Sequence, residues 1–266
     1  MCTAAMQSSE STSVPSASLD ELDLEAFDAF LAEHAPTLAR DEVPREDAMI
    51  RLRVATAMGS RIVPTVAGLY VFGTEPQWLL PQLAVVAVRV AGFDIAGEVV
   101  AREDLTGPFP MLVDSLLAFV EREGRRIVNQ VDPEDSEPEF PLEAVREGIV
   151  NALVHRDLRA GGPVAVRLFE DRLEIWNPGS ANALPNPLAH YMRTGGVSLS
   201  RNPLVSVLSR KLGYSEQLGR GLPVIRDVVV ETVQGEASIE STKEGVLLTI
   251  PSGLHAHEAA RPRIRN

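Results

Sequence analysis

Glu147 and Asn151 are the first pair of residues in this sequence whose types and spacing suit catalytic chemistry. On a helix over 142–154, apolar side chains would take one face and this acid and amide would share the opposite face. A carboxylate can polarise an attacking water molecule, and an amide oxygen one turn away can ligate Mg²⁺. The pair alone is a weak signal, because a solvated surface helix has the same pattern.

The run Gly219-Arg220-Gly221 is a candidate anion site at the start of a helix expected over 221–232. Backbone N–H groups and the positive end of the helix dipole attract anions there, and glycine permits a close approach. Arg220 would add a positive charge for a phosphate. The alternative interpretation is an ordinary loop before a helix.

Two shorter polar runs lie between these candidates. Asn177 and Gly179 follow a β-rich segment. Ser200 and Arg201 precede Asn202-Pro203, a pair typical of an N-cap followed by proline at the first helical position. Ser200 and Arg201 therefore either form part of a lid over a phosphate or belong to the capped start of that helix.

An arrangement of helices and strands must position these residues. Apolar residues at helical period predict helices, and β-branched or compact apolar runs predict strands. The helices are expected at 20–35, 46–57, 107–123, 142–154, 203–212 and 221–232, and the strands at 82–90, 164–169, 173–176 and in a closing pair that ends at residue 251. A compact apolar segment at 64–73 opens with a helical turn, and a long region up to residue 198 is expected to be irregular.

The domain organisation follows from the acidic segment 131–139, in which two prolines mark the expected junction. The fold class is α+β, with a disordered tail at 1–19, a small N-terminal α/β domain at 20–130, a second domain at 140–251 and a basic tail at 252–266. The first tail is too poor in large apolar residues to offset the entropy of ordering.

Composition excludes several classes of protein. The net charge of −12 argues against a broadly basic nucleic-acid surface. Lys211 and Lys243 are the only lysines, and neither stands in a Gly-Lys-Ser/Thr context, so the P-loop of a helicase motor is absent. The single cysteine, Cys2, excludes disulfide frameworks. No segment has the length of a membrane span or the features of a secretory signal, so a cytoplasmic location is expected.

The order and spacing of the polar runs resemble those of the GHKL, or Bergerat-type, ATPases, which include gyrase, the Hsp90 chaperones, the sensor histidine kinases and MutL. The family's first motif, Glu-x-x-x-Asn, is matched by Glu147 and Asn151. The resemblance implies that Glu147 is a general base and that Asn151 ligates Mg²⁺. His155 and Arg156, which follow on the same helix, are expected to close it or to line the rim of the nucleotide site.

The two other GHKL motifs follow in the same order. Asn177-Pro178-Gly179 occupies the place of Asp-x-Gly-x-Gly, with asparagine instead of the aspartate that accepts a hydrogen bond from the adenine amino group. Gly219, Gly221 and Leu222 match Gly-x-Gly-Leu. The resemblance implies ATP and Mg²⁺ as cofactors, and a Bergerat-type sandwich of helices on a mixed sheet at 140–251.

Longer runs at 141–157, 171–179, 200–203 and 213–221 look like the C-terminal module of RecG-like transcriptional regulators, and 64–73 resembles their connecting region. Those proteins usually carry a Schlafen AlbA-type domain, thought to contact nucleic acid, ahead of this module. That domain is expected to be missing here or reduced to the short tail.

The expected function is Mg²⁺-dependent ATP binding, with slow hydrolysis left open, in a regulatory switch. One alternative is a degenerate GHKL-fold interaction module that binds no nucleotide, to which Asn177 lends weight. Another is a DNA-binding regulator that acts through the basic C-terminal tail. A homodimer and a DNA or regulatory-protein partner stay open, whereas no membrane partner is expected.

Overall fold

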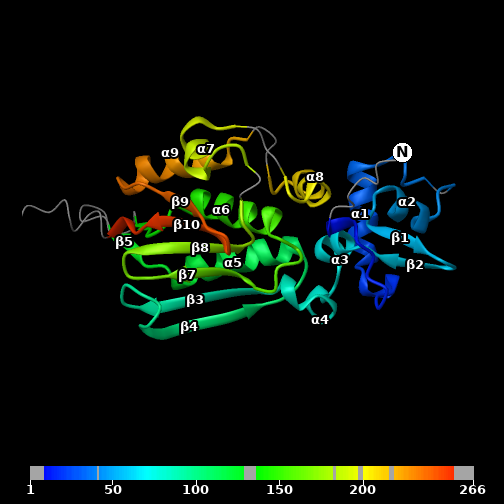
Figure 1. The fold of residues 1–266 in the computed structure, drawn as a ribbon, viewed down its shortest axis with the longest axis horizontal. Coiled ribbons are helices and arrows are strands. Elements are labelled where there is room, and N and C mark those ends of the chain that lie inside the picture. Colours follow the sequence, from blue (N-terminus) through cyan, green and yellow to red (C-terminus); the bar gives the residue numbers. More distant parts are fainter. Residues whose placement is uncertain are drawn as a thin grey trace, which may run out of the picture.

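The computed structural model describes residues 9–40, 42–128, 136–181, 184–196, 200–215 and 219–254. Within these residues, a six-stranded sheet with the strand order β4-β3-β7-β8-β10-β9 forms the centre of the molecule (Figure 1). Its strands are β3 (Val85–Ala91), β4 (Glu98–Leu105), β7 (Val164–Leu168), β8 (Arg172–Pro178), β9 (Ser238–Ser241) and β10 (Gly245–Pro251). The α+β class expected from the sequence is confirmed.

One parallel pairing joins the two halves of this sheet. Strand β3 pairs with β7 in parallel, from Val85 opposite Val164 to Arg89 opposite Leu168, whereas every other neighbouring pair is antiparallel. Strands from both sides of the expected junction at 131–139 therefore lie in one sheet. Residues 129–135 lie outside the described residues, and the division into two domains stays a prediction.

Helices cover one face of the sheet because alternate strand residues point toward them. Among the buried strand residues are Val85, Ala87, Val166, Leu173 and Ile175. The covering helices are α5 (Phe109–Glu123), α6 (Leu142–His155), α7 (Leu188–Thr194) and α9 (Gly221–Val233), and α8 (Pro203–Lys211) lies at the end of this layer (Figure 1). None of the helices in the described ranges is both long and apolar enough to cross a membrane.

The N-terminal part packs beyond the end of the sheet, next to α8 (Figure 1). Its elements are α1 (Leu24–His34), α2 (Arg45–Arg51), β1 (Ala55–Met58), β2 (Arg61–Pro64), α3 (Val66–Phe72) and α4 (Pro76–Leu79). The helix expected over 46–57 is wrong beyond Arg51. Arg53 has a φ of 58°, and the chain then enters a hairpin in which Ala55 pairs with Pro64.

Residues 9–19 are ordered, which corrects the expectation of a disordered tail for that part of 1–19. Val14 N donates to Pro64 O at 2.9 Å, and Val66 N donates to Thr12 O at 2.9 Å. Ala17 is fully buried. Composition misses this order because the hydrogen bonds and the apolar contacts come from residues far along the chain. Residues 1–8 and 255–266, which belong to the two expected tails, lie outside the described residues.

A fully buried arginine, Arg156, follows α6 and contacts three segments. Its guanidinium donates to Leu83 O at 3.1 Å and also to Gln82 O. It lies 5.9 Å from the ring centroid of Tyr70. The carbonyl of Arg156 accepts from Asn202 Nδ2 at 2.8 Å. Backbone carbonyls and an aromatic ring therefore replace the water that this cation loses on burial.

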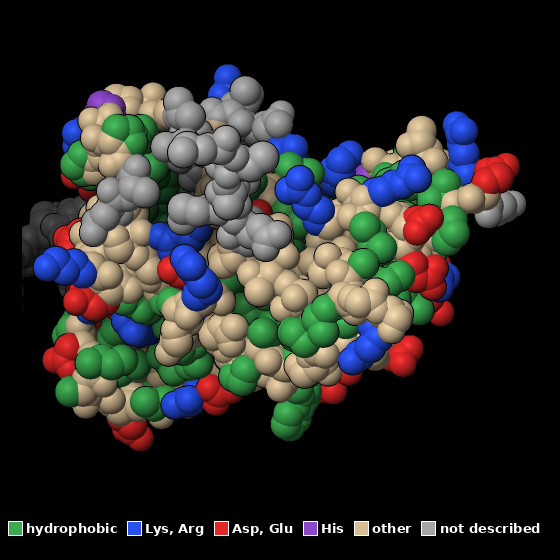
Figure 2. All heavy atoms as spheres, turned by 45° about the vertical axis from the view of Figure 1, so that its right-hand side comes forward, with side chains coloured by type: hydrophobic (Ala, Val, Ile, Leu, Met, Phe, Trp, Pro, Cys, Tyr) green, Lys and Arg blue, Asp and Glu red, His purple; other side chains and the backbone are tan. Residues whose placement is uncertain are grey.

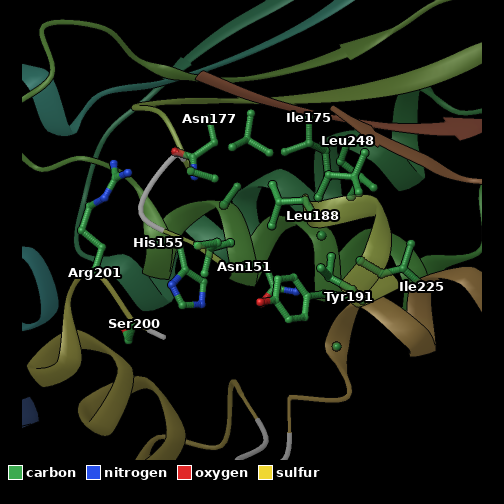
Figure 3. Close-up of a pocket in the computed structure, with 18 of the residues that line it drawn as sticks. Asn151, His155, Ile175, Asn177, Leu188, Tyr191, Ser200, Arg201, Ile225 and Leu248 are labelled. Carbon is green, nitrogen blue, oxygen red and sulfur yellow. The ribbon is translucent and has the colours of Figure 1, made fainter. Parts of the chain in front are cut away.

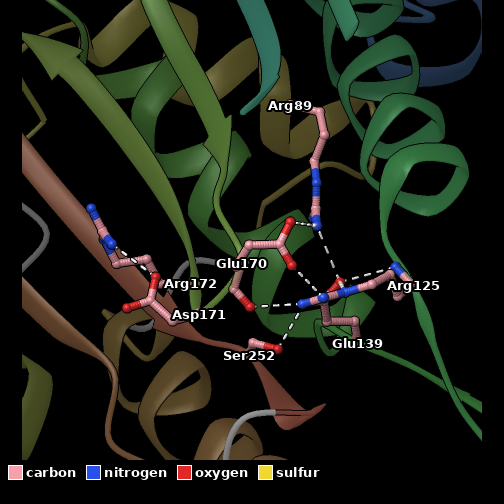
Figure 4. Close-up of polar contacts among 7 residues, drawn as sticks. All are labelled: Arg89, Arg125, Glu139, Glu170, Asp171, Arg172 and Ser252. Carbon is pink, nitrogen blue, oxygen red and sulfur yellow. Dashed lines mark hydrogen bonds and ion pairs between the residues drawn. The ribbon is translucent and has the colours of Figure 1, made fainter. Parts of the chain in front are cut away.

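A second polar cluster, shown in Figure 4, ties the segment before α6 to the sheet. The Glu139 side chain is fully buried and pairs with Arg125 Nη2 at 2.6 Å and Arg89 Nη1 at 3.7 Å. Ser252 Oγ donates to Glu139 at 2.7 Å. Burial opposes ionisation of Glu139, but hydrogen bonds from Arg125 and Ser252 outweigh it and hold the pKa of this carboxyl below its ordinary 4.5.

We predict that Glu139→Gln lowers the free energy of unfolding at pH 7 by about 1–3 kcal/mol, because charged donors lose their partner. With a folded-state pKa below the unfolded one, the ionised Glu139 stabilises the native state above pH 4.5, and this contribution is lost as the pH falls through the folded-state pKa. Urea unfolding at pH 7 and at pH 3 measures the effect. The variant should show a smaller pH dependence, and an unchanged dependence would contradict the role of this carboxyl.

Candidate nucleotide-binding site

A cavity of about 460 Å³ lies among α6, α7, α9 and the sheet (Figure 3). Most of its wall is apolar, and the large side chains there include Ile175, Leu188, Tyr191, Ile225 and Leu248. This size and this lining are typical of a pocket for a small organic ligand, in which a few polar groups fix the orientation.

Polar side chains also line the cavity, among them Asn151, His155, Asn177, Ser200 and Arg201. In Figure 3, Ser200, Arg201 and His155 lie toward one side, and Leu188, Ile225 and Leu248 toward the other. Asn177 Oδ1, Ser200 Oγ and Arg201 Nη1 are buried atoms that make no hydrogen bond within the described residues. Because a buried polar atom without any partner is costly, Asn177 Oδ1 and Ser200 Oγ favour a ligand that would pair with them, whereas Arg201 Nη1 lies 3.7 Å from a carboxylate oxygen of Asp157.

Helix α6 holds Glu147 and Asn151 one turn apart on one face, where both side chains are partly buried and lie against the N-terminus of α9. Asn151 Nδ2 donates to Glu147 Oε1 at 2.8 Å. Glu147 lines a smaller cavity of about 60 Å³, to which Asn151 and His155 also contribute. The carboxylate therefore lies beside the main cavity, and Asn151 belongs to both.

The N-terminus of α9 rests directly on this pair because residue 221 has no side chain. A Cβ on Gly221 would collide with Glu147 Oε1 and lie 3.0 Å from Asn151 Nδ2. Gly219 and Gly221 line both cavities. The N-terminus of α9, the end of a helix that attracts anions, therefore lies against the acid and the amide of α6.

Gly179, after β8, makes room for Arg201. It has a φ of 103°, and a Cβ there would collide with Arg201 Nη1 and lie 2.6 Å from Asp157 Cβ. Arg201 donates to Ser180 O, and its Nη1 lies 3.7 Å from Asp157 Oδ2. These contacts hold the guanidinium at the edge of the cavity.

His155 is uncharged at neutral pH. Burial, followed by the positive charge of Arg201, lowers its pKa from 6.5 to about 4. A neutral imidazole can donate and accept hydrogen bonds, so His155 can pair with a ligand without a change of charge.

The sequence-predicted residues fall into three places. The main cavity is lined by Asn151, Asn177, Gly179, Ser200, Arg201, Gly219 and Gly221. Glu147 lies in the adjoining cavity, whereas Arg220 is exposed at the N-cap of α9 and lines neither cavity.

The sequence did not predict the apolar part of the cavity wall or helix α7, because the region up to residue 198 was expected to be irregular. Leu188, Tyr191 and Met192 recur at helical spacing, and this signal predicts the helix when the preceding Pro187 is taken as its start. Two of these three residues, Leu188 and Tyr191, line the cavity.

A resident metal site is not evident in the part of the chain that the structure describes. No group of three or more His, Cys, Asp or Glu side chains could hold an ion there. Asn151 turns its amide nitrogen toward Glu147, which leaves Oδ1 as the atom that can coordinate a cation. Mg²⁺ commonly takes one or two protein oxygens and completes its shell with phosphates and water.

Comparison with known proteins supports an ATPase-like module. The sequence profile of the HATPase_c_4 family, described as "Putative ATP-dependent DNA helicase recG C-terminal", matches residues 161–250. This match runs from β7 through α9 to β10 and does not include α6, which carries Glu147 and Asn151. No curated protein matches the sequence.

The fold also occurs in a solved structure. The crystal structure of the DIP2311 protein from Corynebacterium diphtheriae is similar, with a TM-score of 0.63 and 22% sequence identity. The similarity covers 92% of this chain and 47% of that one, so this chain spans about half of that protein's length. At this identity the likeness shows a shared fold.

We predict that Gly221→Ala lowers the free energy of unfolding by about 1–3 kcal/mol, because an added methyl group forces Glu147 or α9 to move. Gly161→Ala is the matched control, since an added Cβ there would meet nothing within 4 Å. That control should change stability by no more than about 0.5 kcal/mol. Equal stability of the two variants in thermal and urea unfolding would show that α9 does not rest on Glu147.

Proposed function

We propose that this chain binds ATP together with Mg²⁺ in the 460 Å³ cavity and acts as a nucleotide-dependent regulatory switch. One observation carries the proposal: Asn177 and Ser200 line a cavity that is otherwise mostly apolar, and each has a buried polar atom that makes no hydrogen bond within the described residues. The match of residues 161–250 to an ATPase-like family agrees with it.

The apolar part of the cavity wall suits the base of a nucleotide, and the polar part suits its phosphates. Apolar side chains such as Ile175 and Leu248 would contact the base, and Asn177 would pair with its polar edge. The N-terminus of α9, at Gly219 and Gly221, would take the phosphates. Ser200 and Arg201 would add a hydroxyl and a positive charge at the rim.

Residues of α6 would serve the phosphate end. When bound, Mg²⁺ would neutralise phosphate charge, and Asn151 Oδ1 would hold it. Glu147, oriented by the amide of Asn151 at 2.8 Å, would accept a proton from a water molecule in the smaller cavity. We propose that ATP is hydrolysed slowly by this route. We also propose that residues 140–251 form the ATP-binding module and that residues 20–130 form a connecting domain of the RecG-like type ahead of it.

The DNA-binding alternative has no specific support on the visible face of the molecule. Lys and Arg side chains are interspersed with Asp and Glu over the face in Figure 2. The described residues of that face form no continuous basic surface of the kind that dominates affinity for nucleic acid, and most of the basic tail on which this alternative depends, from residue 255, lies outside the described residues.

We predict that Mg-ATP raises the melting temperature. A ligand at about ten times its Kd stabilises the native state by about 1.4 kcal/mol, which corresponds to about 3–6 °C for a chain of this size. Asn151→Ala should reduce the shift, whereas Glu147→Ala should retain it and lower any hydrolysis by about 10²–10⁴-fold. Differential scanning fluorimetry measures the shift in melting temperature, and a phosphate-release assay measures the rate of hydrolysis. The proposal is wrong if millimolar Mg-ATP leaves the wild-type melting temperature unchanged.

We predict weak discrimination between ATP and GTP, because an asparagine can turn either its acceptor or its donor toward a base, whereas an aspartate only accepts. The wild type should bind the two nucleotides within about tenfold of each other, and Asn177→Asp should favour ATP by about 10–100-fold, the scale of one unpaired buried polar group. Competition of both nucleotides against a fluorescent analogue measures the ratio. Strong ATP selectivity that is equal in both proteins would show that Asn177 does not contact the base.

A further inference from the structure

Glu10 is a buried acid from the N-terminal segment that reaches a helix far along the chain. Its residue is 1% exposed. Glu10 Oε1 accepts from Leu204 N at 2.9 Å, and Oε2 accepts from Val205 N at 2.9 Å. Both donors lie in the first turn of α8, where helix N–H groups have no partner within the helix.

The N-cap residue of helix α8 does not cap it, since the acceptor Asn202 Oδ1 is buried and makes no hydrogen bond within the described residues. Instead, Asn202 Nδ2 donates to Val154 O at 2.9 Å and Arg156 O at 2.8 Å, at the end of α6. Glu10 therefore supplies from a distance the acceptor that a local Ser, Asp or Asn usually provides.

The residues directly before this helix start line the main cavity. Ser200 and Arg201 are joined to α8 through Asn202, so two attachments fix where they lie. Asn202 holds the start of α8 to the end of α6, and Glu10 holds the first turn of α8 to the N-terminal segment. The segment carrying Glu10 is itself held to the strand end at Pro64 by the hydrogen bond from Val14.

We propose that Glu10 is a positioning residue for the cavity: by capping α8 it holds Ser200 and Arg201 in the wall, so that docking of the N-terminal segment and occupancy of the cavity are coupled. The part that concerns nucleotide affinity rests on the proposed function. The positioning itself does not. Because coupling is reciprocal, a ligand in the cavity also stabilises the docked N-terminal segment.

Hydrogen exchange tests the positioning without any ligand. In Glu10→Ala, the amides of Leu204 and Val205 should exchange about tenfold faster or more, the scale of a lost hydrogen bond to a charged group. The NMR signals of the Ser200 and Arg201 backbone amides should also shift. Glu10→Gln, which keeps one acceptor oxygen, should restore part of the protection at Leu204 and Val205. Faster exchange at Leu204 and Val205 with unchanged signals of Ser200 and Arg201 would overturn the proposal, because Glu10 would then be only a helix cap.

Glu21→Ala is the matched control. Glu21 is an acid of the same N-terminal segment, but its hydrogen bonds from Ser18 N at 2.6 Å and Ser18 Oγ at 2.7 Å are local. Its removal should leave exchange at 200–205 unchanged. If Glu21→Ala accelerates that exchange as much as Glu10→Ala does, general loosening of the segment explains the effect and the contact at α8 does not.

Nucleotide affinity tests the coupling. Titration with Mg-ATP should show affinity at least about fivefold weaker in Glu10→Ala than in the wild type, at the lower end of typical coupling between sites. In an Arg201→Ala background, Glu10→Ala should change Kd by less than about twofold, since the two residues act on one wall. If the losses of Mg-ATP affinity caused by Glu10→Ala and Arg201→Ala were fully additive in the double variant, Glu10 would not act through Arg201. A wild type that binds no Mg-ATP would refute the proposed function, whereas the exchange pattern would still decide the role of Glu10.

Discussion

Arg156 lies fully buried where three segments meet, and it contacts all of them through hydrogen bonds or a ring contact. A buried cation without compensation is costly, so the carbonyls of Gln82 and Leu83 and the ring of Tyr70 must stay in place around it. Its backbone carbonyl binds Asn202, which starts α8. This single residue therefore fixes the end of α6 relative to the N-terminal part and to the helix that borders the cavity.

Helices whose apolar residues recur at helical spacing could be predicted closely from the sequence. The helices expected at 107–123, 142–154 and 221–232 correspond to α5, α6 and α9 within two residues at each end. Strand β4 was not predicted, because it lies at the sheet edge and carries charged residues such as Arg102 and Asp104, so it has no continuous apolar run. The pairing of β3 with β7 is also a tertiary property that no local pattern contains.

The candidate site was partly accessible from sequence. Spacing placed Glu147 and Asn151 on one helix face, and the glycines at 219 and 221 at a helix start, as the structure has them. Their assignment to ATP and Mg²⁺ stays a prediction. The unpaired atoms of Asn177 and Ser200 could not be predicted, since a lack of partners depends on every neighbouring segment. The exposure of Arg220 depends likewise on how α9 approaches α6.

The parallel pairing of β3 with β7 affects folding during synthesis and the choice of fragments that can fold by themselves. During synthesis the β3–β4 hairpin leaves the ribosome before β7, which ends at residue 168. Until β7 is made, the backbone N–H and C=O groups on one edge of β3 have no strand to pair with. A fragment that begins at residue 161, where the family match starts, would present the bare edge of β7 instead. Open edges recruit strands from other molecules and promote aggregation. The start of the sequence similarity is therefore a poor place to divide the protein, and fragments that keep β3 through β10 together avoid the bare edge.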